Sequence, residues 1–153
     1  MKKLGVFLLI VLCLFVTGCG EDKLKEVVTI DEFVRVLEDE SFVIKDNSSD
    51  YSSHSYITNS RKATLGDLEI EMIEYSDSKS AENVLESHIE SFKLLKSTAA
   101  HEKESKGDNY HRYFLVSNRM YMISARVENT LIFCKTNLDN KDIVDEIFDE
   151  LDY

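Results

Sequence analysis

Three runs of alternating residues, joined by two very short turns, constrain the fold of this chain more than any other feature. They span residues 110–136, and the turns fall at Asn118-Arg119 and Glu128-Asn129. A two-residue turn makes neighbouring strands antiparallel and determines which of their residues face each other. The pattern therefore predicts an antiparallel meander of three strands.

The turn positions also predict the register of this meander. The expected facing pairs are Val116 with Tyr121, Phe114 with Ile123, Ile123 with Cys134, and Ala125 with Ile132. Successive side chains of a strand point to opposite faces, so all of these residues share one face, which we expect to be buried. Cys134 is then a small core residue rather than a reactive thiol.

The opposite face of the meander is also apolar, although Arg126 and Lys135 lie among its residues. The apolar residues of this second face are Tyr113, Leu115, Met120, Met122, Leu131 and Phe133. We expect a helix to cover it. If every helix packs on the first face instead, the second face stays exposed. An exposed apolar patch of several hundred Å² is larger than a soluble monomer tolerates, so the second face would then be a binding or dimer surface.

Periodicity and capping residues predict the remaining elements. Thr29 and Glu32 form a T-x-x-E capping box, with Val28 and Phe33 as a hydrophobic staple, so a helix begins there. Further helices are expected from Asp77 or Ser78 to about residue 95, and after Asp139 or Asn140, and further strands at 42–45, 55–63, 67–75 and 97–101. The predicted fold is a single α+β domain over residues 29–153, an antiparallel sheet with three packed helices in the order α-βββ-α-ββββ-α.

The N-terminus has the pattern of a secretory signal peptide. Two lysines at 2–3 precede an apolar run at 4–16, and small residues at 17–18 come directly before Cys19. The apolar run has 13 residues, whereas crossing a bilayer takes about 20. Residues 1–18 are therefore expected to be a cleaved signal peptide.

The four residues Val16-Thr17-Gly18-Cys19 resemble the lipobox of bacterial prolipoproteins. The resemblance implies that Cys19 receives a diacylglycerol, that cleavage occurs just before it, and that residues 19–28 become a lipidated cysteine with a short tether. Two acyl chains suffice for stable anchoring, which places the domain on the extracytoplasmic side of the cell membrane. The alternative is a plain signal peptide with a chance cysteine.

The last third of the chain carries a second resemblance. Residues 124–132 are similar to a strand of small uncharacterised lipoproteins of Gram-positive bacteria, in which it precedes a closing acidic helix. Here Ala125 stands between the serine and the arginine of that pattern. This likeness implies the class of protein and no site residue.

Charge and composition exclude several functions. The net charge of −11 becomes −13 when Lys2 and Lys3 leave with the signal peptide, which argues against a nucleic-acid partner. Beyond residue 18 the glycines lie far apart, at 20, 66 and 107, so no loop can cradle the phosphates of a nucleotide cofactor.

No motif in the sequence identifies an enzyme. The four histidines lack the spacing of metal ligands, so we expect no metal, and only a pairing of His54 with His111 in space stays open. The sequence favours a membrane-anchored binding module with a protein or peptide partner. The alternative is a small extracytoplasmic enzyme whose site is assembled only by the fold.

Overall fold

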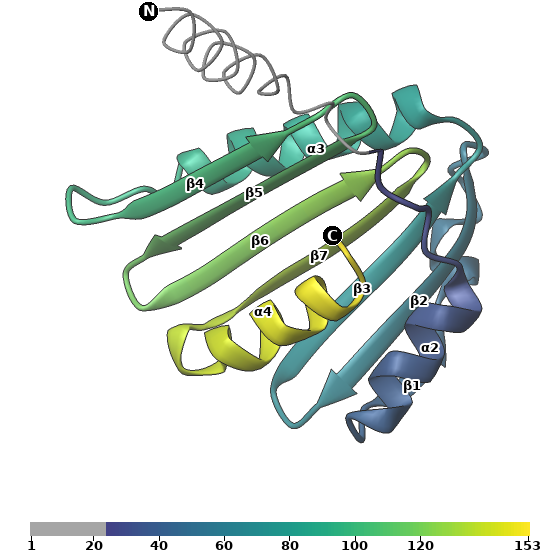
Figure 1. Ribbon diagram of the computed structural model, residues 1–153, viewed down its shortest axis with the longest axis horizontal. Helices are drawn as coiled ribbons and strands as arrows, with labels where there is room; N and C mark the ends of the chain where they lie inside the picture. The colour runs from purple at the N-terminus through teal and green to yellow at the C-terminus, as the bar shows by residue number, and fades with distance from the viewer. Residues whose placement is uncertain (1–23) are drawn as a thin grey trace, which may run out of the picture.

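A single antiparallel sheet of seven strands organises the computed structural model, which describes residues 24–153 (Figure 1). The strands are β1 (Val43–Asp46), β2 (Ile57–Leu65), β3 (Leu68–Tyr75), β4 (His101–Lys106), β5 (Tyr110–Ser117), β6 (Met120–Val127) and β7 (Thr130–Asn137). Their order across the sheet is β1-β2-β3-β7-β6-β5-β4, so β3 and β7 meet in the middle. The strands predicted as a group of three and a group of four thus form one continuous sheet.

Three α-helices pack on this sheet: α2 (Ile30–Asp39), α3 (Ser78–Lys93) and α4 (Lys141–Glu150). Two short 3-10 helices, η2 (Ser48–Tyr51) and η3 (Leu138–Asn140), were not predicted. The predicted class, an α+β fold with an antiparallel sheet and three helices, is confirmed. None of the helices within residues 24–153 is long and apolar enough to cross a bilayer. The predicted signal peptide and Cys19 lie outside the described residues.

Two of the three predicted helix starts have the side-chain cap that was expected, whereas α4 begins after Asn140 without one. The Thr29 hydroxyl accepts the backbone N–H of Glu32 at 3.2 Å at the start of α2. The Asp77 carboxylate accepts the backbone N–H of Ser80 at 2.8 Å at the start of α3. Each cap satisfies an N–H group that has no partner inside the helix.

The predicted register of the meander is also confirmed. All four expected pairs occur, including Ile123 opposite Cys134. Asn118 and Arg119 have φ of 51° and 62°, the left-handed backbone that a two-residue hairpin turn of this handedness requires. The turn chemistry therefore places every side chain of β5, β6 and β7 on its correct face.

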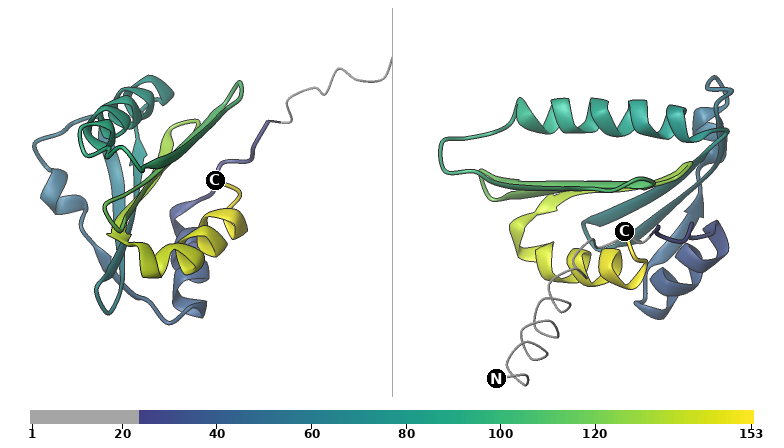
Figure 2. Two further views of the ribbon diagram at one scale, coloured as in Figure 1. Left: turned by 90° about the vertical axis from the view of Figure 1, so that its left-hand side faces the viewer. Right: turned by 45° about the horizontal axis from the view of Figure 1, so that its top comes forward.

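Helices cover both faces of the sheet (Figure 2). Helices α2 and α4 pack on the face that carries Ile123 and Cys134. Helix α3 packs on the other face, through Leu85, Ile89 and Phe92. The expectation that a helix covers the second face is therefore confirmed.

The alternative, an exposed binding surface on this second face, is wrong. Tyr113, Leu115, Met122 and Leu131 are at most 1 % exposed beneath α3. Met120 and Phe133, at the margin of the helix, are partly buried. The six residues form a second core, because α3 removes their apolar surface from water.

One strand differs in position from its prediction. A strand was expected at 97–101, whereas β4 spans His101–Lys106. Its sequence, HEKESK, is polar throughout and mostly exposed because β4 forms an edge of the sheet. Alternation of apolar and polar residues cannot reveal a strand that buries neither face, and charged residues suit an edge that must not pair with other chains.

We expect Cys134 to react slowly with thiol reagents in the folded protein. Its side chain is 1 % exposed, and burial raises the pKa of the thiol to about 12. The reactive thiolate is therefore scarce at neutral pH. Replacing Cys134 with serine is expected to cost about 1–3 kcal/mol, because a buried hydroxyl lacks partners there. Labelling with and without urea, followed by mapping of the Cys134 peptide, checks this; equal labelling rates in the two conditions would contradict it.

Candidate functional site

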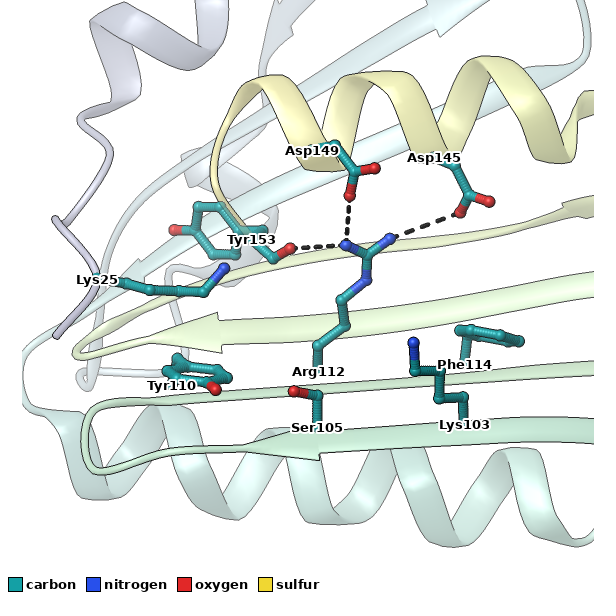
Figure 3. A pocket seen from close by; sticks show the side chains of 9 residues that line it. All are labelled: Lys25, Lys103, Ser105, Tyr110, Arg112, Phe114, Asp145, Asp149 and Tyr153. Atoms are coloured by element: carbon teal, nitrogen blue, oxygen red, sulfur yellow. Dashed lines mark hydrogen bonds and ion pairs between the residues drawn. The ribbon is translucent and has the colours of Figure 1, made fainter. Parts of the chain in front are cut away.

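A groove with a volume of about 470 Å³ lies between α4 and the β4–β5 hairpin (Figure 3). It lies on the α2–α4 face, beyond the part of the sheet that these helices cover. The residues that line it are Lys25, Lys103, Ser105, Tyr110, Arg112, Phe114, Asp145, Asp149 and Tyr153. We call this set the α4 groove.

Arg112 bridges the two walls of the α4 groove. It projects from β5, and its Nη1 donates to Oδ1 of Asp149 at 2.6 Å and to the backbone oxygen of Tyr153 at 2.9 Å. Its Nη2 lies 3.6 Å from Oδ1 of Asp145. The guanidinium also lies over the ring of Phe148, 5.7 Å from its centroid. These contacts hold the charge of Arg112 in one place and tie α4 to β5.

The N-terminal segment of the described chain forms one end of the groove. The backbone N–H of Lys25 donates to Oδ1 of Asn109 at 3.1 Å, and Nδ2 of Asn109 donates to the backbone oxygen of Lys25 at 2.8 Å. The Lys25 ammonium donates to the backbone oxygen of Asp152 at 2.7 Å and lies 5.1 Å from the Tyr110 ring centroid. The chain predicted to be a free tether as far as residue 28 is thus bound to the domain from Lys25 onward.

The remaining polar and aromatic groups of the groove are open to a ligand. Lys103, on β4, is exposed, and its side-chain ammonium has no ion pair or hydrogen bond among residues 24–153. Phe114 lies opposite Lys103 on β5 and is half-buried. Tyr110 lies at the hairpin end, where its ring covers Gly107 so closely that any side chain at 107 would collide with it. The groove therefore offers one unpaired cation beside the ring of Phe114, and the ring of Tyr110 lies at its other end, beyond Ser105 and Arg112 (Figure 3).

Sequence reasoning predicted none of these groove residues. Arg112 and Asp149 are 37 positions apart, and no local spacing connects them. The alternation of β5 already placed Arg112 on the same face as Phe114, which was expected to be buried. An arginine on a core face is the one sequence feature that indicates a partner from another element.

A second polar cluster lies on the α3 face. Nδ1 of His88 is 3.0 Å from Oγ of Ser124, within hydrogen-bonding distance. This is the nearest approach to a base–nucleophile pair in the described chain, but Ser124 is 0 % exposed. A hydroxyl that no substrate can reach does not act as a nucleophile, so the pair belongs to the core.

The other candidate ligands do not converge. Within the described residues no three His, Cys, Asp or Glu side chains lie together as metal ligands. His111 is buried beside Glu104, with its Nε2 2.7 Å from Oε1 of that residue. His54 is exposed and lies against the rings of Tyr51 and Tyr56. The structure therefore gives His54 and His111 different partners.

We expect His88 to make stability depend on pH. Burial lowers the pKa of His88, and the nearby carboxylate of Glu71 only partly opposes this. In the unfolded chain the pKa of a histidine is about 6.5. As the pH falls below that value, the unfolded chain takes up a proton that the folded chain resists, so the free energy of unfolding decreases until the lowered pKa is passed.

Urea denaturation at pH 7.5, 6.5 and 5.5 checks this prediction. The wild type is expected to lose more stability over this range than His88→Gln, which keeps the other three histidines. Equal losses in the two proteins would contradict it.

Comparison of this chain with protein-family models, with curated proteins and with solved structures found no match. The protein is therefore described by its own geometry. It is an α+β domain with a preorganised, mixed-charge groove beside its N-terminal segment.

Proposed function

We propose that this protein is a membrane-anchored, extracytoplasmic binding module and that the α4 groove is its ligand site. The observation that carries the proposal is the unpaired Lys103 beside Phe114, in a groove whose other charges are already held in place (Figure 3). Most specific ligand sites are concave, partly apolar and equipped with a few fixed polar groups.

The position of Lys25 supports a site close to the membrane. Lys25 lines the groove and is bound to Asn109 and Asp152. Lys25 comes six positions after Cys19, so the two residues are at most about 20 Å apart even when the chain between them is fully extended. With lipid on Cys19, the α4 groove opens within that distance of the bilayer surface and faces ligands that reside there.

The groove chemistry favours a ligand with an anionic group and an apolar part. Lys103 provides the available positive charge, whereas Arg112 is neutralised by Asp145 and Asp149. Phe114 supplies apolar surface beside that charge. A carboxylate-bearing peptide or protein segment meets both requirements, in agreement with the protein or peptide partner that the sequence favours.

A photo-crosslinking amino acid in the groove tests the proposal. Ser105 is exposed and lines the groove, so a crosslinker at this position in membrane-bound protein should form a discrete adduct with a ligand. The adduct should decrease when Lys103→Glu reverses the cation. A matched control carries the crosslinker at Leu94, which is 87 % exposed at the end of α3 on the opposite face. Equal adducts at both positions, or an adduct insensitive to Lys103→Glu, would contradict the proposal.

A further inference from the structure

Six of the nine residues that line a second hollow, on the α3 face, have aromatic or imidazole rings. Its volume is about 160 Å³, the space of about five water molecules at the density of the liquid. It is lined by Tyr51, His54, Tyr56, Ile57, Ile73, Tyr75, Val84, His88 and Phe133. We call it the aromatic hollow. It lies between the η2 segment and α3, on the sheet face opposite the α4 groove.

The rings of the aromatic hollow lie in more than one orientation. The rings of Tyr56 and Tyr75 are nearly parallel, with an interplanar angle of 6° and centroids 6.3 Å apart. The His54 ring is turned 79° from Tyr56 and 69° from Tyr51. Ring faces therefore point in more than one direction around the hollow, an arrangement that encloses a compact group instead of stacking on a flat one.

A carboxylate lies beside the aromatic hollow, and Lys62 and Lys135 lie around the adjoining one. No lysine or arginine lines the aromatic hollow itself. The buried carboxylate of Glu71 lies beside one wall, where its Oε1 accepts the hydroxyl of Tyr51 at 2.7 Å. Burial is the largest cause that raises the pKa of Tyr51. The hydrogen bond to Glu71 and the charges of Glu71 and Asp50 raise it further, because they disfavour the anionic form of the phenol. Donation to a carboxylate also makes the phenol ring richer in electrons, which strengthens the attraction of its face for a cation.

We propose that the aromatic hollow binds a trialkylammonium group. Such a group is cationic, apolar on its surface and compact, and aromatic cages recognise it through the faces of their rings. Glu71 supplies the complementary charge without needing to contact the ligand. This site is independent of the α4 groove and of the function proposed for it.

Titration with choline and with 3,3-dimethyl-1-butanol, its uncharged isostere, tests the proposal on the full-length protein in detergent. NMR shift changes of residues around the hollow report binding. We expect choline to bind about tenfold more tightly than the isostere, since the two differ in charge and hardly in shape. Binding should weaken about tenfold in Tyr56→Leu and persist in Tyr56→Phe, which keeps the ring. Tyr56 is 39 % exposed, so neither variant removes a core side chain.

Two outcomes would overturn the proposal: equal affinity for choline and the isostere, including no binding of either, or choline binding that Tyr56→Leu leaves unchanged. Vesicles identify the source of the group. Binding to phosphatidylcholine vesicles over phosphatidylglycerol vesicles, with loss in Tyr56→Leu, supports a lipid headgroup. Choline binding without this vesicle preference supports a soluble ligand of the same chemistry.

Discussion

Met122→Glu is expected to unfold the domain. Met122 is 1 % exposed in the centre of β6 and belongs to the core cluster that contains Leu85 of α3. A carboxylate at this position would be buried without a partner, which costs about 3–5 kcal/mol. That is comparable to the whole stability of many small domains. Far-UV circular dichroism and urea denaturation measure the loss directly.

Met120 provides the matched control for this prediction. It has the same side chain, lies on the same face of β6 two residues earlier, and is only partly buried. Glutamate at 120 can reach water, so Met120→Glu is expected to cost about 1 kcal/mol or less. A stable, folded Met122→Glu protein would show that α3 does not cover this face in solution and would restore the face as a possible binding surface.

Cys19→Ala is expected to abolish anchoring by lipid. Cys19 is the only cysteine that follows the pattern Val-Thr-Gly at 16–18, and without its thiol the proposed diacylglycerol has no attachment point. Two acyl chains account for stable anchoring, because each buried methylene contributes about 0.8 kcal/mol. The variant should therefore remain as uncleaved precursor or leave the membrane fraction. Fractionation followed by immunoblotting distinguishes these forms from the wild type.

Cys13→Ala is the control for this experiment. Cys13 lies within the apolar run, six residues before Cys19, and alanine preserves the apolar character of that run. The variant should be cleaved and anchored as the wild type is. Equal fractionation of Cys19→Ala and wild-type protein, with both cleaved, would contradict the proposed lipid attachment.

The elements that sequence reasoning predicts well are those with a local physical cause. The register of β5, β6 and β7 follows from turns only two residues long, so an error of one position would have moved Cys134 from the core to the other face. The caps at Thr29 and Asp77 are equally local, since each spans three residues. In both cases the interacting groups are close along the chain.

The features that sequence reasoning could not predict arise from long-range packing. Alternation shows that the face of Met122 is apolar, but three helices can share two faces in several ways. Only the fold assigns α3 to that face, alone, and α2 with α4 to the other. The uncovered strip beside α4 then becomes a groove, in which Arg112 meets Asp149 from 37 positions away.

The aromatic hollow has the same origin. Tyr51 and Tyr56 lie before β2, His88 lies on α3, and Phe133 lies on β7. Each of these four rings alone is an ordinary exposed or partly buried side chain. The carboxylate beside the hollow is that of Glu71, whose burial is unusual for a carboxylate and depends on donors from Asn47, Tyr51 and Ser60. Burial of this kind needs several hydrogen bonds at once, and these partners come from η2, the residue before it, and β2.

The central proposal, that this domain is anchored by lipid on Cys19, is tested most directly by the intact mass of the protein isolated from membranes. We predict a chain whose first residue is Cys19, with an added mass of one diacylglycerol on the cysteine. The N-terminal peptide released by protease should carry the whole increment. A membrane protein that retains residues 1–18, or a chain found in the soluble fraction without added mass, would contradict the account.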